Sequence, residues 1–208
     1  MAYESLKEDF AGVNVVTATP FTESGEEVHY EKVRENARAL VDAGISLLIP
    51  CGGVSEYYSL STEERVGVVE ATVEAVGEEA SVVAGAGGST KNAIDLVDRY
   101  EEVGADATML MFPQRPGINR DGLEPYYRQI IESTDLGVML YKKDVRLDTE
   151  LVDELGSHEN VVAVKHAIGD LSNFVADVND VDSDLVWVDG TAEVPAVGFG
   201  VEGVDGFT

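Results

Sequence analysis

Lys165 is the residue whose type and position most clearly suggest chemistry. It ends an apolar run, Val161-Val162-Ala163-Val164-Lys165, of the kind that forms a buried strand. Burial disfavours the ammonium form and lowers a lysine pKa from its reference of about 10.4, so that a neutral amine becomes available to attack a carbonyl carbon. A lysine at a strand end can instead extend to solvent or pair with a carboxylate. We expect Lys165 to form an imine with its substrate.

Tyr141 occupies the corresponding position in the preceding apolar run, Val138-Met139-Leu140-Tyr141. If the two runs are neighbouring strands, both side chains lie at the same edge of the sheet. Imine formation requires protons to move to and from the carbinolamine, and a phenol within hydrogen-bond reach can move them. The alternative is a tyrosine that covers the core with its hydroxyl in water. Taken alone, the residue favours this second role, and a proton relay beside Lys165 is the functional alternative.

A glycine-rich segment, Gly52-Gly53-Val54-Ser55-Glu56, follows the second apolar run. Glycines let a ligand approach the backbone closely, and the amides of this segment together with the Ser55 hydroxyl can bind a carboxylate. A plain connecting loop is the alternative, because a Gly-Gly pair alone carries little information. We expect Gly53, Val54 and Ser55 to contact the carboxylate of the substrate.

Short apolar runs alternate with amphipathic helical patterns along the whole chain, which predicts repeated βα units and a parallel sheet. The eight predicted strands are residues 13–17, 45–51, 81–84, 107–111, 138–141, 161–165, 185–189 and 204–207. The predicted helices are residues 30–43, 62–76, 91–103, 123–133, 149–155, 171–179 and 192–198. Eight such units close into a TIM-type (β/α)8 barrel, whose active sites lie at the C-terminal ends of the strands. A doubly wound open sheet is the alternative fold.

The starts of several helices are marked by capping residues. Ser61 and Glu64 have the spacing of a capping box, and Ser89 and Asp170 are suitable N-caps. We expect residues 1–208 to form a single barrel domain. Because the sequence stops at Thr208, directly after the eighth predicted strand, we expect the barrel to be truncated there, with the C-terminal helix or helices missing.

The chain is strongly acidic, with 40 Asp and Glu against 14 Lys and Arg and a formal net charge of −26. Such a surface repels phosphate backbones and anionic membranes, so we expect neither nucleic acid nor a membrane as a partner. The acidic residues are spread along the chain, which favours a folded, salt-adapted surface and a halophilic source over a disordered tail. A single cysteine, and the lack of a signal-like or membrane-spanning apolar stretch, favour a cytoplasmic protein.

Metal and nucleotide sites have no support in the sequence. His29, His158 and His166 show no metal-ligand spacing with one another or with Cys51. Neither a P-loop nor a complete G-x-G-x-x-G fingerprint is present. We expect no metal and no cofactor beyond the covalent imine on Lys165. His166 directly follows this lysine, so we expect its side chain on the opposite side of the strand, in packing rather than in chemistry.

Taken together, these motifs resemble the dihydrodipicolinate synthase and N-acetylneuraminate lyase superfamily of class I Schiff-base lyases. The resemblance covers nearly the whole chain, and its motifs follow the order and spacing of the family. They are Thr19-Pro20-Phe21, the glycine-rich segment ending at Glu56, Ala84-Gly85-Ala86-Gly87-Gly88, Tyr141, Lys165 followed by Gly169-Asp170, and Gly190.

The resemblance implies that the substrate is pyruvate or another small 2-oxo acid. It implies that Lys165 forms the imine, that Tyr141 relays protons, and that the loop from Gly53 to Ser55 holds the carboxylate. Arg146 stands where several relatives place an arginine for a second substrate carboxylate, although a surface arginine is the alternative. Gly190, after the seventh strand, is also expected at the substrate. Relatives are commonly homotetramers, so the resemblance implies a homo-oligomer.

Two departures from the family pattern bear on the choice of substrate. The synthases and lyases usually have Gly-Thr-Thr-Gly-Glu or Gly-Ser-Thr-Gly-Glu where this chain has Gly52-Gly53-Val54-Ser55-Glu56, so two hydroxyls are missing. Their tyrosine-rich segment after the fourth strand is replaced by Phe112-Pro113-Gln114-Arg115. By contrast, Glu56-Tyr57-Tyr58-Ser59-Leu60 and Tyr141-Lys142-Lys143-Asp144 are similar to segments of 5-dehydro-4-deoxyglucarate dehydratases.

We therefore expect a lyase that dehydrates a keto-deoxy sugar acid or cleaves it by an aldol reaction. A dihydrodipicolinate synthase or a 2-keto-3-deoxygluconate-type aldolase is the alternative, because all of these enzymes share the imine. A barrel that binds a 2-oxo acid without turning it over is the non-enzymatic alternative, suggested by the altered Gly53-Val54-Ser55 loop.

Overall fold

Eight parallel strands form one sheet in the computed structural model, which describes residues 3–114, 117–191 and 196–208. The strands are β1 (Asn14–Val16), β2 (Leu47–Ile49), β3 (Ser81–Ala86), β4 (Ala107–Leu110), β5 (Gly137–Lys142), β6 (Val161–His166), β7 (Val186–Asp189) and β8 (Gly206–Phe207). Each strand pairs with the next one in the chain. A parallel bridge between Val13 and Phe207 joins the last strand to the first, so the sheet closes into a barrel.

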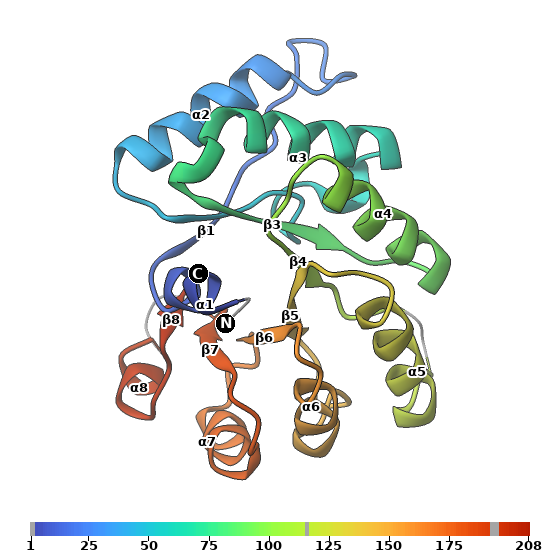
Figure 1. The fold of residues 1–208 in the computed structure, drawn as a ribbon, viewed down its shortest axis with the longest axis vertical. Helices are drawn as coiled ribbons and strands as arrows, with labels where there is room; N and C mark the ends of the chain where they lie inside the picture. The colour runs from blue at the N-terminus through green and yellow to red at the C-terminus, as the bar shows by residue number, and fades with distance from the viewer. Residues whose placement is uncertain (1–2, 115–116, 192–195) are drawn as a thin grey trace.

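The helices that follow the strands lie around the outside of this barrel (Figure 1). They are α2 (Tyr30–Asp42), α3 (Thr62–Val76), α4 (Thr90–Glu102), α5 (Arg120–Ile131), α6 (Thr149–Gly156), α7 (Leu171–Asp180) and α8 (Ala196–Val201), with short 3-10 turns η1 (Tyr57–Ser59) and η2 (Gly77–Glu79). The TIM-type (β/α)8 barrel predicted from the sequence is confirmed, and the open sheet is excluded. The first part of the last predicted helix, residues 192–195, lies outside the described residues.

The predicted helix starts are formed by the expected capping residues. The backbone amide of Glu64 donates to the Ser61 hydroxyl at 3.2 Å, and the amide of Ser61 donates to the Glu64 carboxylate at 2.8 Å, which completes a capping box for α3. Ser89 accepts from the amide of Asn92 at the start of α4, and Asp170 caps α7. These contacts satisfy amides that have no partner within their own helix.

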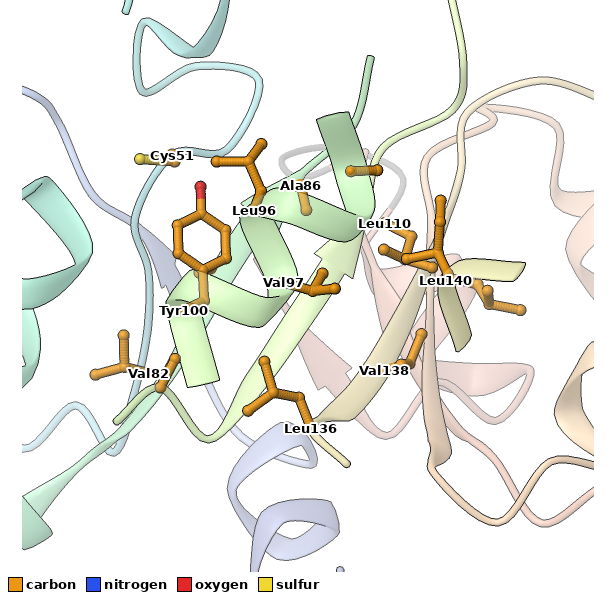
Figure 2. Close-up of a cluster of buried hydrophobic side chains, with 14 of the residues drawn as sticks. Cys51, Val82, Ala86, Leu96, Val97, Tyr100, Leu110, Leu136, Val138 and Leu140 are labelled. Atoms are coloured by element: carbon orange, nitrogen blue, oxygen red, sulfur yellow. The ribbon is translucent and has the colours of Figure 1, made fainter. Parts of the chain in front are cut away.

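Side chains alternate between the two faces of the barrel wall, as the period of a strand requires. Inward-facing residues such as Met109, Met139 and Ala163 form the cluster that fills the barrel. Outward-facing residues join the helices in a second cluster. Figure 2 shows part of it, where Leu96 and Tyr100 of α4 lie near the β3 side chains and Val97 lies toward those of β4 and β5. The wall is therefore buried on both sides, which explains why its strands read as short continuous apolar runs.

A short helix that the sequence analysis did not predict, α1 (Glu4–Phe10), covers one end of the barrel (Figure 1). Its buried residues, Leu6 and Phe10, belong to the inner cluster. A Cβ at Gly137, the first residue of β5, would lie 2.4 Å from Leu6 Cδ2. The helix thus closes the end where the strands begin, and leaves the opposite end, where the strands finish, for a site.

Gly85 on β3 is required because the backbone of the neighbouring loop crosses directly over it. A Cβ at this position would lie 2.0 Å from the carbonyl oxygen of Cys51, and Cys51 already has a φ of 57°. Backbone atoms cannot move aside as the end of a flexible side chain can. A substitution here must displace the loop that follows β2.

We predict that Gly85→Ala destabilises the protein by about 1–3 kcal/mol, the usual cost of overpacking. Its thermal unfolding midpoint should fall by roughly 2–4 °C per kcal/mol for a chain of this size. Gly169→Ala is the matched control, because a Cβ there meets nothing within 4 Å. Equal midpoints for the two variants would contradict the prediction.

Candidate active site

Tyr141 and Lys165 lie side by side at the C-terminal ends of two adjacent strands. The register of β5 and β6 pairs these two residues directly. Tyr141 packs with the inner cluster, and Lys165 alternates with Ala163, a member of the same cluster, so both side chains face the barrel interior. The sequence predicted this juxtaposition from strand order, and the register confirms it.

The amine of Lys165 is almost completely removed from water. The residue is 6% exposed, and desolvation lowers the pKa of Lys165 to about 8. The charge of Asp189 opposes this shift, whereas the positive charge of Lys143 adds to it. A lysine with such a pKa supplies neutral amine at physiological pH, which is the form that attacks carbonyl carbon.

The Lys165 amine has two polar neighbours on the barrel rim. Its Nζ lies 5.3 Å from the centroid of the Tyr141 ring and donates a hydrogen bond of 3.1 Å to the Thr208 hydroxyl. Burial raises the pKa of Tyr141 above its usual value, and the nearby Tyr58 adds to the effect. The phenol is therefore protonated at neutral pH and is able to donate.

Gly190 leaves room for the side chain of Lys165. A Cβ on Gly190 would lie 2.8 Å from Lys165 Cε and 2.9 Å from its Cγ. The amide of Gly190 also donates to the carbonyl of His166 at 2.7 Å, which ties the segment after β7 to β6. The glycine thus sets the path of the lysine, and it borders the same hollow as the amine.

Five of the residues predicted from the sequence border one hollow of about 490 Å³. They are Gly53, Val54, Tyr141, Lys165 and Gly190, and the hollow is also lined by Thr208 and by residues of β1. The loop after β2 and the ends of β5, β6, β7 and β8 thus meet at one place. A small 2-oxo acid fits a space of this size beside the amine.

Ser55 belongs to the same loop, but its hydroxyl is directed away from this hollow. The side chain is fully buried and donates to the carbonyl of Thr17, while the Thr19 hydroxyl donates to the carbonyl of Ser55 at 2.7 Å. These bonds join the loop after β2 to the segment after β1. In this arrangement Ser55 holds the loop in place, and its predicted contact with a carboxylate stays a prediction.

Arg146 lies at a second hollow, of about 370 Å³, which shares Tyr141 with the first. Its Nε and its terminal Nη2 donate to the two carboxylate oxygens of Asp144, at 2.8 and 2.7 Å, and the guanidinium lies 5.1 Å from the Phe112 ring centroid. Side chains from several loops complete the lining, among them Tyr58, Gln114 and Lys143. Arg146 is exposed and oriented by its neighbours, and its predicted binding of a substrate carboxylate stays a prediction.

Two residues at the site were not singled out from the sequence, Lys143 and Thr208. Lys143 Nζ lies 5.9 Å from the Tyr141 ring centroid and makes no ion pair within the described part of the chain. The only available signal was position: Lys143 lies two residues after Tyr141, and Thr208 comes directly after the eighth predicted strand.

Within the ranges described, no three His, Cys, Asp or Glu side chains gather as a metal site would need. None of the described helices has both the length and the apolar character that crossing a bilayer demands. The sequence-based expectation of a reaction without metal or bound cofactor remains a prediction.

Comparison with known proteins gives consistent matches. A 4-hydroxy-tetrahydrodipicolinate synthase from Haloarcula marismortui is 32% identical over 203 residues, which cover 94% of this chain and 66% of the relative. One from Methanosphaerula palustris is 33% identical, with 94% of this chain and 70% of the relative covered. The chain therefore spans about two thirds of the length of these relatives.

Solved structures agree with this result. A dihydrodipicolinate synthase from Oceanobacillus iheyensis superimposes with a TM-score of 0.94 at 33% identity, covering 99% of this chain and 69% of the other. One from Bacillus clausii gives a TM-score of 0.93 at 36% identity, with coverage of 98% and 69%. The model of the dihydrodipicolinate synthetase family matches residues 9–208. With this match and the shared barrel, the chain belongs to the dihydrodipicolinate synthetase family.

Proposed function

We propose that the protein is a Schiff-base lyase in which Lys165 forms an imine with a small 2-oxo acid. The observation that carries the proposal is the desolvated amine of Lys165, 6% exposed and with a pKa lowered to about 8, beside Tyr141 at the C-terminal end of a barrel strand. This is the end of the barrel where enzymes of this fold place their catalytic groups. Membership in the family supports the same chemistry.

The proposed reaction begins when the neutral amine attacks the carbonyl carbon of the 2-oxo acid. The carbinolamine loses water and leaves a protonated imine, which withdraws electrons from the neighbouring carbon. The Tyr141 phenol, which burial keeps protonated, exchanges protons with the intermediates. The amides of Gly53 and Val54, whose residues line the same hollow, are placed to receive the carboxylate.

For the substrate we propose a keto-deoxy sugar acid that is dehydrated. Once the imine has formed at C2, a proton leaves C3 and the C4 hydroxyl leaves with it as water, and hydrolysis then frees the lysine. The second hollow supports a substrate longer than pyruvate, because it continues past Tyr141 and contains the cations Lys143 and Arg146. In a chain with a net charge of −26, these cations favour an anionic group at the far end of the substrate.

Two other activities share the imine and remain candidates. The matched relatives are named 4-hydroxy-tetrahydrodipicolinate synthases, which favours that reaction, and an aldolase for a keto-deoxy sugar acid needs the same nucleophile. The lack of side-chain hydroxyls at Gly53 and Val54 argues against the synthase and also motivates a binding barrel without turnover. An assembly of four copies is a proposal that rests on the family resemblance.

The first test is covalent trapping of the imine in the full-length protein. Borohydride added with pyruvate should attach the reduced ligand to the peptide that contains Lys165, as measured by mass spectrometry. Lys165→Ala should lose the adduct and all turnover. Lys91→Ala, which changes an exposed lysine at the start of α4, should retain both. An adduct on another lysine, or turnover by Lys165→Ala, would refute the mechanism.

The second test is the pH dependence of imine formation. With a pKa of about 8, roughly a tenth of the Lys165 amines are neutral at pH 7, against well under roughly 0.1% for a lysine at its reference pKa. The trapping rate should therefore rise with pH through a midpoint of about 8. Lys143→Ala should move this midpoint to higher pH, because it removes a positive charge that disfavours the ammonium form of Lys165. A midpoint near 10 in the unaltered protein would contradict the assignment.

The third test concerns the far end of the substrate. Arg146→Ala should raise the KM for keto-deoxy sugar acids that carry a second carboxylate by about tenfold or more, since a hydrogen bond to a charged group contributes about 1.5–3 kcal/mol. Imine formation with pyruvate, which does not reach the second hollow, should stay unchanged. Arg99→Ala, at a surface ion pair of 3.7 Å with Glu63, is the control. If Arg146→Ala weakened the reaction with pyruvate as much as the reaction with the sugar acids, this role for Arg146 would be ruled out.

A further inference from the structure

The eighth strand brings a hydroxyl to the reactive nitrogen. Thr208 follows β8, and its Oγ1 accepts a hydrogen bond of 3.1 Å from Lys165 Nζ. In the described part of the chain, this is the one hydrogen bond that the amine makes. Thr208 also lines the hollow that contains Lys165, Tyr141 and Gly190. Its hydroxyl is therefore in contact with both the nucleophile and the space for the substrate.

Other hydroxyl groups near the amine are few. Among the described residues that line this hollow, only Tyr141 and Thr208 carry a hydroxyl. Tyr141 presents its ring to the amine, with 5.3 Å between Nζ and the ring centroid. In the loop after β2, the hydroxyl of Ser55 is buried and bound to the carbonyl of Thr17.

The lack of a hydroxyl at Gly53 is not imposed by crowding. A Cβ at this position would meet only Met111 Cε, at 3.7 Å, which is an ordinary contact. A serine would therefore fit there. The chain has instead no side chain at Gly53, and the hydroxyl that contacts the amine comes from Thr208, directly after β8.

We propose that Thr208 is a catalytic residue, whose hydroxyl transfers the first proton of imine formation. This inference rests on the proposed imine chemistry of Lys165. As the nitrogen bonds to C2, the electron pair of the carbonyl double bond moves to its oxygen. The Thr208 oxygen takes a proton from the nitrogen and gives its own proton to that carbonyl oxygen, so the neutral carbinolamine forms and the threonine hydroxyl is restored. Tyr141 then serves the later step, in which the carbinolamine hydroxyl leaves as water.

The geometry also gives Thr208 an effect on the direction of attack. Because the hydroxyl accepts one N–H of the amine, the lone pair of the nitrogen is directed away from the Thr208 oxygen. The transfer requires an oxygen at this position that both accepts and donates. Valine has the shape of threonine without that oxygen, and serine keeps the oxygen without the methyl group.

The test compares Thr208→Val, Thr208→Ser and Thr208→Ala in the full-length protein, with borohydride trapping of the pyruvate imine at timed intervals. Thr208→Val should form the imine about 100-fold more slowly, at the lower end of what a positioned proton-transfer group contributes. The final amount of adduct at saturating pyruvate should equal that of the unaltered protein. Thr208→Ser should form the imine at a rate close to the unaltered one. Thr22→Val, in the loop after β1, is the control and should change nothing.

The outcomes separate this inference from the proposed function. If the unaltered protein forms no imine, the proposed function fails and the role of Thr208 fails with it. If it forms the imine and Thr208→Val does so at the same rate, the role of Thr208 alone is overturned. If the valine variant does not fold, the serine and alanine variants, which differ by one oxygen, decide the question by their relative rates. A reduced final amount of adduct at an unchanged rate would show that Thr208 only supports the site structurally.

Discussion

In the proposed mechanism, the amine of Lys165 has to stay out of water at an end of the barrel that must also admit substrate. Inward packing of β6 buries the stem of the side chain, and Gly190 leaves the space through which it passes. Direct pairing with Tyr141 then places an aromatic ring against the nitrogen. These contacts come from β5, from β6 and from the segment after β7, so the low pKa of Lys165 depends on how these neighbouring parts of the barrel pack together.

A buried ion pair on the outer side of the barrel wall holds the strands of Tyr141 and Lys165 to helix α7. Lys142 follows Tyr141, and its Nζ lies 2.6 Å from a carboxylate oxygen of Asp177 on α7, with both side chains fully buried. Burial works against the charged carboxyl, but hydrogen bonds from His166, Lys142 and Thr149 hold the pKa of Asp177 below its usual value. Adjacent residues of a strand face opposite sides. Tyr141 and Lys165 therefore face the site, whereas the residues that follow them, Lys142 and His166, face Asp177. Removing one partner of such a pair leaves an unpaired buried charge, which is strongly destabilising.

Periodicity and strand order predicted most of the fold and the central pair of the site. Apolar runs located all eight strands, and Lys165 and Tyr141 could be placed together because parallel strands end at the same edge. The seven-residue helix α1 was missed, because two buried residues make too short a pattern to recognise. The orientation of the Ser55 hydroxyl and the contact of Thr208 with Lys165 depend on loop conformation and barrel closure, which one-dimensional patterns do not encode.

In the proposed function, specificity and reactivity are separable, because the two hollows share Tyr141 but differ in their other lining residues. The hollow at Lys165 is lined largely by apolar residues and backbone, which suits the 2-oxo acid group common to all candidate substrates. The proposal therefore assigns substrate discrimination to the second hollow, where Arg146 is held by Asp144 and Lys143 has no carboxylate partner among the described residues. In a chain so rich in carboxylates, a cation left unpaired beside the reactive lysine disfavours the ammonium form of Lys165 and attracts an anionic substrate. The same charge therefore acts on both the nucleophile and the choice of ligand.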